Sequence, residues 1–262
     1  MKPLAIIPVY NEWDILPAVL RHLRAQECVP YVLDNWSTDS IPAEAVDEVW
    51  PSVAVRAVAE GRSFSDVLRA IRDSYDWTGI LQRVEEIALA NPGRWVMLHD
   101  ADEIRRGLPG RTLHESLIIA EDRGYNAVEF GVREYVPVDN SWVPGRDAEN
   151  HFRYYRLPRV DSCLPHVKAW YQQRQRVDLH SSGGHSVAFA GRNISPVPFL
   201  LKHYPIRSQA HGERKVLRER LPRYSQKERA MNWHVQYDQY IEQPAPNFLG
   251  DPKELIYDAE VP

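Results

Sequence analysis

The sequence lacks the features that mark several classes of protein. Its 262 residues include two cysteines, Cys28 and Cys163, which excludes a disulfide scaffold and any metal site built on Cys-x-x-Cys pairs. No stretch approaches the ~20 consecutive apolar residues that a membrane-spanning helix needs. The first apolar run stops at Pro8 and is soon followed by Glu12, unlike a secretory signal peptide. We therefore expect a cytoplasmic protein without a transmembrane segment, for which peripheral contact with a membrane stays open.

An excess of basic charge is also lacking. Lysine and arginine total 32 against 36 aspartate and glutamate residues, so the formal net charge is −4. Because nucleic-acid-binding domains usually carry a strong basic excess, we expect no nucleic-acid partner. The content of 44% hydrophobic and 26% charged residues is that of an ordinary globular protein, and a chain of this length can bury a large core without disulfides.

Short apolar runs alternate with amphipathic helical patterns through the first hundred residues. The runs that we expect to form strands are Leu4–Val9, Tyr31–Leu33, Val53–Val55 and Trp95–Leu98. Apolar residues at helical spacing predict helices around Leu16–Leu23 and Ile80–Ala88, and a shorter helix is expected from Pro42 to about Val49. Strands that alternate with helices imply βαβ units, and hence an α/β fold with a mostly parallel sheet.

The second half of the chain shows weaker patterns. Thr112 and Glu115 form a capping box, which predicts the start of a helix that Gly124 closes. Residues 135–200 are rich in proline, glycine and aromatic residues, and we expect them to form loops with short strands. The proline-rich end, residues 244–262, is predicted to be an irregular tail.

Polar clusters directly follow three of the expected strands. They are Tyr10-Asn11-Glu12, Asp34-Asn35 and Asp100-Ala101-Asp102. In parallel α/β sheets, ligands bind beyond the carboxyl ends of the strands, so we expect the three clusters at one edge of the sheet. The paired carboxylates of Asp100 and Asp102 suit a hard divalent cation such as Mg²⁺ or Mn²⁺, which prefers oxygen ligands.

Three longer segments contain these clusters. They are Pro8-Val9-Tyr10-Asn11-Glu12, Asp34-Asn35-Trp36-Ser37-Thr38-Asp39 and Trp95–Glu103 (WVMLHDADE). In this order and at this spacing they resemble the family 2 glycosyltransferases of the GT-A fold, whose usual forms are P-x-Y-N-E, D-[DN]-G-S-x-D and a strand that ends in D-x-D. The Asp-Ala-Asp-Glu version resembles a subgroup of bacterial sugar transferases.

The resemblance covers residues 3–105 well and includes one later matching segment at residues 201–208. The sequence departs from the family pattern at Trp36, where glycine is common, and at His99, where an aspartate or a small residue is common. Neither departure removes a carboxylate.

The resemblance implies an α/β, Rossmann-like GT-A fold, with a mostly parallel mixed sheet flanked by helices and an irregular C-terminal acceptor region. It implies one domain over residues 1–262, in which 1–105 bind the nucleotide sugar, 106–243 form the acceptor and catalytic half, and 244–262 form the tail. The implied activity is metal-dependent transfer of a sugar from a nucleotide-sugar donor, expected to be UDP-linked. The acceptor would be a hydroxyl group of a glycan or small molecule, and the anomeric carbon would be inverted.

The same resemblance implies roles for individual residues. The residues expected to contact the donor are Pro8, Tyr10, Glu12, Asp34, Asn35, Arg83, Asp100, Arg207 and Lys215. The residues expected to hold Mn²⁺ or Mg²⁺ are Asp100, Asp102 and the late His203. The ion would neutralise the charge that develops on the leaving diphosphate. For Arg83, as for the basic stretch that holds Arg207 and Lys215, a solvated helix face is an equal alternative.

Transfer with inversion needs a base that takes the proton of the acceptor hydroxyl. The two leading candidates are His185 and Asp139. His185 lies in Ser181-Ser182-Gly183-Gly184-His185, a turn that can present the ring. Asp139 follows a strand that is predicted from the alternation of Val128, Phe130 and Val132.

Two other functions fit parts of the pattern. A nucleotidyltransferase that forms a nucleotide sugar shares the α/β architecture and the need for a metal, but it normally has a glycine-rich basic loop after the first strand, and residues 8–12 contain no glycine or lysine. A catalytically silent sugar-binding module is the second alternative, against which the complete acidic pair argues.

Overall fold

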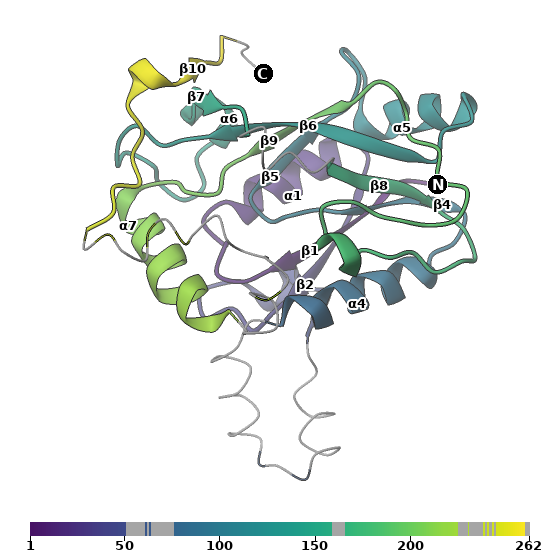
Figure 1. Cartoon of the computed structure of the whole chain (residues 1–262), viewed down its shortest axis with the longest axis horizontal. Helices are drawn as coiled ribbons and strands as arrows, with labels where there is room; N and C mark the ends of the chain where they lie inside the picture. Colours follow the sequence, from purple (N-terminus) through teal and green to yellow (C-terminus); the bar gives the residue numbers. More distant parts are fainter. Residues whose placement is uncertain are drawn as a thin grey trace.

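The computed structural model describes residues 1–50, 61, 63, 76–158, 166–224, 230, 238, 240, 243 and 245–259 (Figure 1). Cys163 and the strand expected at Val53–Val55 lie outside the described residues. The strands are β1 (Leu4–Val9), β2 (Val29–Asp34), β3 (Glu48–Val49), β4 (Arg94–Leu98), β5 (Glu103–Arg106), β6 (Ala127–Tyr135), β7 (Tyr154–Arg156), β8 (His166–Gln172), β9 (Phe199–His203) and β10 (Ile256–Tyr257). The α-helices are α1 (Leu16–Ala25), α4 (Trp77–Leu89), α5 (Leu113–Asp122), α6 (Ala148–His151) and α7 (Gln209–Gly212). The shorter or wider helical turns are η1 (Ala43–Ala45), η3 (His180–Ser182), η4 (Glu213–Arg220), η5 (Leu221–Arg223) and η7 (Pro252–Glu254).

The described strands form one mixed sheet in the order β10-β7-β6-β8-β4-β1-β2-β3, to which β9 joins beside β6, and β5 beside β9. The N-terminal strands run parallel: β1 pairs with β2 and β4, and β2 pairs with β3. β8 runs antiparallel between β4 and β6. The predicted α/β fold, a mixed sheet flanked by helices, is confirmed. The sheet is only partly parallel, not mostly parallel as expected: β6 and β9 also pair in parallel, and the other pairings are antiparallel.

The first strand is apolar throughout because both faces of the sheet are covered. Alternate residues of β1 point to opposite faces. Ala5, Ile7 and Val9 pack in the core that contains α1 and α5, whereas Leu4 and Ile6 pack in the core that contains α4 (Figure 1). A strand buried on both sides reads as a continuous apolar run, which is why the sequence revealed it.

Two helix signals are confirmed atom by atom. The backbone N–H of Glu115 donates to Thr112 Oγ1 at 3.1 Å, and the backbone N–H of Thr112 donates to Glu115 Oε2 at 2.8 Å, so the capping box opens α5. Gly124, with φ +84°, follows the end of that helix. In α4 the apolar stripe from Ile80 to Ala88 is buried as its spacing predicted.

The helix expected from Pro42 to Val49 does not form. Only η1 is helical there, and the chain then pairs with the edge of the sheet as β3. The backbone N–H groups of Asp47 and Trp50 donate to the carbonyls of Val32 and Asp34 at 3.0 and 2.8 Å. The open edge of β2 satisfies these groups, so they need no helical partners.

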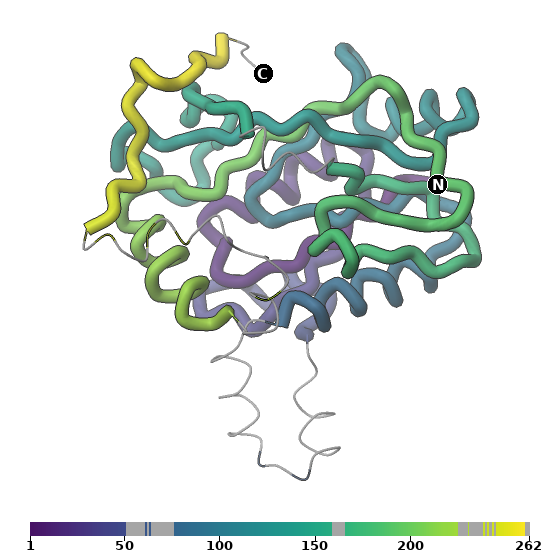
Figure 2. Tube along the Cα trace, in the orientation of Figure 1, coloured from purple at the N-terminus to yellow at the C-terminus, as the bar shows by residue number. Residues whose placement is uncertain are grey.

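Part of the segment expected to be an irregular tail, residues 244–262, joins the sheet. Within its described part, 245–259, most residues lack regular structure, but η7 and the two-residue strand β10 form. Figure 2 shows this yellow segment running beside the teal chain of β6 and β7, and β10 pairs antiparallel with β7. Asp258 is buried, accepts a hydrogen bond from the hydroxyl of Tyr135, and lies 3.1 Å from Lys202 Nζ. The pattern missed this because the partners of Asp258 are distant in sequence. No helix among the described residues is long and apolar enough to cross a membrane.

Candidate active site

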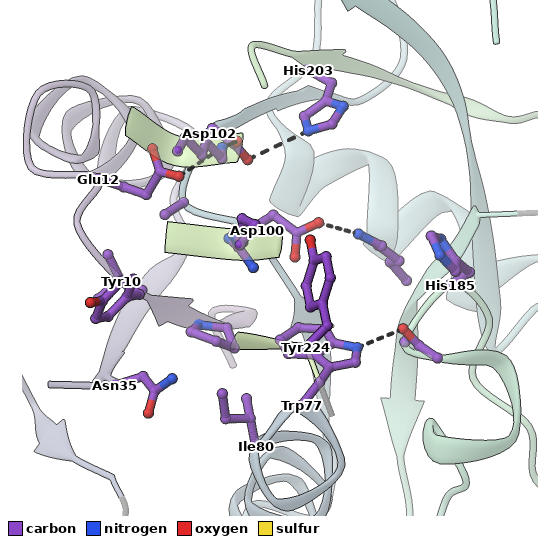
Figure 3. Close-up of a pocket in the computed structure, with 18 residues that line it drawn as sticks. Tyr10, Glu12, Asn35, Trp77, Ile80, Asp100, Asp102, His185, His203 and Tyr224 are labelled. Carbon is purple, nitrogen blue, oxygen red and sulfur yellow. Dashed lines mark hydrogen bonds and ion pairs between the residues drawn. The ribbon is translucent and has the colours of Figure 1, made fainter. Parts of the chain in front are cut away.

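A cleft lies at the carboxyl ends of β1, β2 and β4 (Figure 3). The residues after these strands, Tyr10, Asn35 and Asp100 among them, line it together. The backbone N–H of Asn35 donates to the Val9 carbonyl at 2.8 Å, which keeps the ends of β1 and β2 in register. The convergence expected of the three polar clusters therefore occurs, because parallel strands deliver their carboxyl ends to the same edge.

The cleft brings together most of the residues singled out in the sequence. Those that line it are Pro8, Tyr10, Glu12, Asn35, Asp100, Asp102, His185, His203 and Lys215. Further lining residues that sequence reasoning missed are Trp77, Ile80, Lys168, Gly183, Gly184, Arg220 and Tyr224. Of these, Lys168 carried a signal: a lone lysine in the apolar run of β8 must be buried, and a buried lysine needs a carboxylate partner.

Asp34 and Arg83 lie outside this cleft. The carboxylate of Asp34 accepts from the backbone N–H of Ser37 at 3.1 Å and from its hydroxyl at 2.6 Å. It lines a neighbouring acidic cavity with Glu48, and its burial raises its pKa. Arg83 is partly buried and donates to Glu48 at 2.8 Å and to Glu86 at 2.7 Å.

Arg207 and Asp139 also lie outside it. Arg207 is fully buried behind Glu12 and donates to that carboxylate and, at 2.6 Å, to Asp14 Oδ2. Asp139 is exposed and accepts hydrogen bonds from Ser141, which lower the pKa of its carboxyl. Neither residue is among those that line the cleft.

Asp102 is held in a buried ion pair. Lys215 Nζ lies 2.7 Å from Asp102 Oδ2 and 2.7 Å from Glu12 Oε1, and His203 Nε2 lies 3.6 Å from Asp102 Oδ1. Burial alone would raise the pKa of Asp102, but the charges of Lys215 and His203 outweigh it and hold the pKa well below its usual range. Burial would lower the pKa of His203, and Asp102 outweighs that effect and raises it.

Asp100 has a buried lysine of its own. Lys168 Nζ, on β8, lies 2.6 Å from Asp100 Oδ2 and 3.2 Å from Glu103 Oε1. Burial would lower the pKa of Lys168, but the two carboxylates outweigh burial and raise it. The lysine is therefore charged at neutral pH, and it forms part of the wall of the cleft.

A tight glycine turn places His185 at the cleft. Gly184 has φ +87°, and a Cβ there would meet the side chain of Leu81 at 3.0 Å, so other residues are excluded on two grounds. Trp77 Nε1 donates to the Gly183 carbonyl at 2.8 Å, which ties the turn to α4. Burial and the nearby charge of Lys168 lower the pKa of His185, so its ring is neutral at pH 7 and can accept a proton.

The loop after β2 keeps a glycine-like backbone without glycine. Trp36 has φ +59°, a conformation that costs roughly 1–2 kcal/mol for an L-residue. Nearby, Asn11 Oδ1 accepts from the backbone N–H of Thr38 at 2.6 Å, and the Asn11 backbone N–H donates to Ser37 Oγ at 3.0 Å. These bonds fix the loop against the end of β1 and hold Trp36 in a left-handed backbone conformation.

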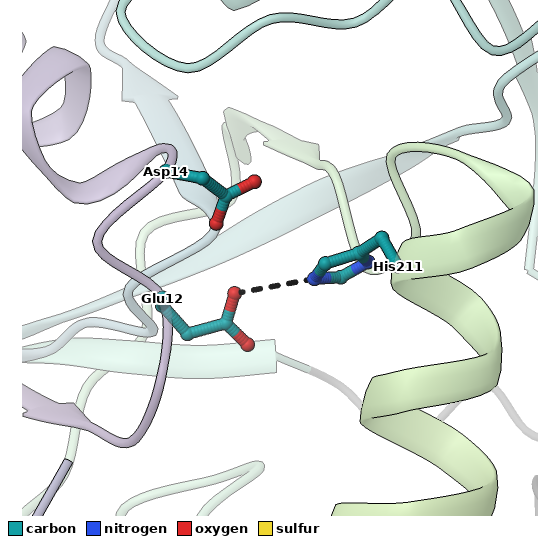
Figure 4. Close-up of side chains that lie close together, drawn as sticks. All are labelled: Glu12, Asp14 and His211. Carbon is teal, nitrogen blue, oxygen red and sulfur yellow. Dashed lines mark ion pairs between the residues drawn. The ribbon is translucent and has the colours of Figure 1, made fainter. Parts of the chain in front are cut away.

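Glu12, Asp14 and His211 form a possible metal-binding cluster (Figure 4), because they each offer a ligand atom within 4.8 Å of the others. The guanidinium of Arg207 already occupies the space between them. Its Nη2 donates to Glu12 and Asp14 and lies 2.7 Å from His211 Nε2. A buried arginine in this position supplies the positive charge that a cation would bring.

The trio expected to hold the divalent cation does not fit one as placed. Among the residues that the structure describes, Asp100, Asp102 and His203 do not bring three ligand atoms within 4.8 Å of one another. Each aspartate is instead turned to a buried ammonium, Lys168 for Asp100 and Lys215 for Asp102. One carboxylate oxygen of each aspartate is therefore already engaged in an internal ion pair.

Comparisons with known proteins add similarity of structure at a low level. No protein-family model and no curated protein matches the sequence. The crystal structure of TarS from S. aureus is similar to this chain at 13% identity and a TM-score of 0.42, covering 78% of this chain and 37% of TarS. TarS 1-349 is similar at 13% identity and a TM-score of 0.38, covering 78% of this chain and 61% of that one. This chain therefore spans less than two thirds of either TarS chain. Apo UDP-glucose pyrophosphorylase gives 10% identity, a TM-score of 0.30, and coverage of 78% and 90%.

Proposed function

We propose that this chain transfers a glycosyl group from a nucleotide-sugar donor, expected to be a UDP-sugar, to a hydroxyl group of a glycan or small molecule. One observation carries the proposal. The carboxyl ends of three strands bring an aromatic ring, an amide and two carboxylates into a cleft that also holds buried lysines and a neutral histidine. These are the groups that a nucleoside, a diphosphate and an acceptor hydroxyl each require.

The nucleoside end of the donor is assigned to Tyr10 and Asn35. Both line the cleft at the ends of adjacent parallel strands. The guanidinium of Arg223 lies 4.0 Å from the centroid of the Tyr10 ring, which fixes the ring in place. A ring held in this way can stack on a base, and the amide of Asn35 offers both a donor and an acceptor for its polar edge.

The reacting end of the donor is assigned to the part of the cleft between Asp100 and His185. In the reaction, the acceptor oxygen forms a bond to the anomeric carbon while the bond from that carbon to the diphosphate oxygen breaks. The electron pair of the broken bond stays on the diphosphate, and the acceptor proton passes to the ring of His185. A single displacement of this kind inverts the anomeric carbon. His185 suits the base role because its lowered pKa keeps the ring unprotonated.

The test begins with binding and continues with chemistry. We expect UDP to raise the melting temperature of the protein more than UMP, and a panel of UDP-sugars with hydroxyl acceptors to reveal one pair that releases UDP. Release of pyrophosphate from UTP and a sugar phosphate would assign the chain to the nucleotidyltransferases instead. Stabilisation by a sugar without release of UDP or pyrophosphate would mark a binding module. Absence of stabilisation by any nucleotide would contradict the proposal.

A further inference from the structure

Two buried lysines oppose the carboxylates that a divalent cation would use. Lys168 lies on β8 and Lys215 on η4, and each side chain is 4% exposed. Their Nζ atoms lie 2.6 Å from Asp100 Oδ2 and 2.7 Å from Asp102 Oδ2. Both lysines are among the residues that line the cleft, so a donor bound there would lie beside them.

Two further acidic groups, Glu12 in the cleft wall and Glu103 buried behind it, are also balanced by internal cations. Glu12 pairs with Lys215 and with Arg207, and Glu103 pairs with Lys168 and with Arg105. A site for Mg²⁺ or Mn²⁺ gathers carboxylate oxygens around the ion at roughly 2.0–2.2 Å. Here one oxygen of Asp100 and one oxygen of Asp102 already bind ammonium groups, and a divalent ion between these carboxylates would meet two like charges at close range.

We infer that the donor site holds a diphosphate with Lys168 and Lys215 in place of a divalent cation. The inference rests on the proposed function and deepens it. In the transfer, the electron pair of the broken bond to the anomeric carbon remains on the departing diphosphate oxygen. Ammonium groups fixed in a buried wall stabilise that charge without having to reorganise, which is the usual source of electrostatic catalysis in enzymes.

The first experiment titrates the full chain with UDP by calorimetry, in EDTA and in MnCl₂. We expect the two dissociation constants to agree within about threefold, because the positive charge belongs to the protein. A dissociation constant about tenfold or more weaker in EDTA would overturn the inference.

Two variants distinguish a lysine site from a metal site, because the two kinds of site predict opposite effects on UDP binding. With lysines at the diphosphate, Lys215→Met weakens UDP binding by about tenfold or more, whereas Asp102→Asn leaves it equal or tighter because one negative charge is lost. With a metal at the site, Asp102→Asn abolishes Mn²⁺-dependent binding and Lys215→Met keeps it. The second pattern contradicts the inference.

Two further variants separate a specific loss of UDP binding from a failure to fold. Lys215→Met leaves buried carboxylates without their cation, so the double variant Lys215→Met/Asp102→Asn, which removes one charge of each sign, is measured beside it. It should melt near the wild-type temperature and still lose UDP binding. Lys202→Met is the matched control, since Lys202 is equally buried, pairs with Asp258 and Glu149, and lies outside the cleft. Its UDP affinity should equal that of the wild type.

Inorganic pyrophosphate separates this inference from the proposed function. Binding of pyrophosphate in EDTA, with UDP no tighter, supports the lysine site and contradicts a nucleotide donor. Binding of UDP only with Mn²⁺ contradicts the lysine site and supports the donor. Absence of binding by either probe under both conditions contradicts both.

Discussion

Two networks of buried charge differ in what they face. The cleft network consists of Lys168, Lys215 and the carboxylates of Glu12, Asp100, Asp102 and Glu103. The tail network consists of Lys202, Arg106, Glu149, Asp258 and Tyr135. The lysines of both are almost fully buried, at 3–4% exposure of the side chain.

The cleft network borders an open space. The tail network lies outside the cleft, and its members Lys202, Glu149 and Asp258 are buried while Arg106 is partly exposed. The same ion-pair chemistry therefore has two uses. Where a cavity adjoins the charges, they can act on a ligand, and where protein closes over them, they can only hold the fold together. Burial alone does not distinguish charges that can act on a ligand from charges that only stabilise the fold. The following measurements therefore test binding and turnover at the cleft, and stability in the tail network.

The largest expected effect is on turnover at the cleft. We expect His185→Gln to lower turnover at least about 100-fold while UDP affinity stays near that of the wild type, since a general base contributes to the reaction more than to donor binding. Steady-state kinetics and UDP titration measure the two quantities. His151→Gln is the control, because that ring packs against Trp142 away from the cleft. Near-normal turnover in His185→Gln would remove this residue as the base.

The next largest effect is on stability, in the tail network. Asp258→Ala leaves Lys202 with one fewer carboxylate and Tyr135 without an acceptor, so we expect a loss of about 3–5 kcal/mol in the free energy of unfolding. Asp251→Ala, which removes only a cap of η7 in the same segment, should cost about 1 kcal/mol. Urea unfolding measures both. Equal losses in the two variants would show that Asp258 is not a structural anchor.

The pH dependence of stability sharpens the same point. Burial would raise the pKa of Glu149, but Arg106 and Lys202 outweigh it, and the net shift is downward from 4.5. A lowered pKa in the folded state gives stability that is present above pH 4.5 and lost as the pH falls through the folded value. We expect Glu149→Gln to flatten this acid loss and to reduce stability at pH 7 by about 1.5–3 kcal/mol. An unchanged slope of unfolding free energy against pH would count against this ion pair.

The smallest expected effect is on stability and comes from backbone strain instead of charge, at Trp36 in the loop after β2. Alanine and glycine both remove the Trp36 side chain, but only glycine adopts φ +59° without strain. We expect Trp36→Gly to be more stable than Trp36→Ala by about 1 kcal/mol in thermal or urea unfolding. If alanine proved as stable as glycine, the left-handed turn would not be required.

Local patterns in the sequence predicted the elements whose causes are local. The apolar run of β1, the stripe of α4 and the capping box at Thr112 each depend on residues within a few positions of one another. The helix expected after Pro42 failed because the open edge of β2, not the local pattern, satisfied those backbone groups. Likewise, nothing near Asp258 in the sequence indicates its partners on β6 and β9.

The sequence by itself determined that polar residues at the ends of three strands would meet, since parallel strands share a direction and polar residues directly follow their apolar runs. Only the tertiary structure decided which charges stand beside them. The insertion of β8 between β4 and β6 brings Lys168 to Asp100, 68 positions away, and the return of the chain through η4 brings Lys215 to Asp102, 113 positions away. Arg207 is drawn out of reach of the cleft in the same way, by Asp14 and Glu12. Ion pairs of this range leave no periodic trace in a sequence, because they depend on how distant strands are ordered and not on the spacing of neighbours.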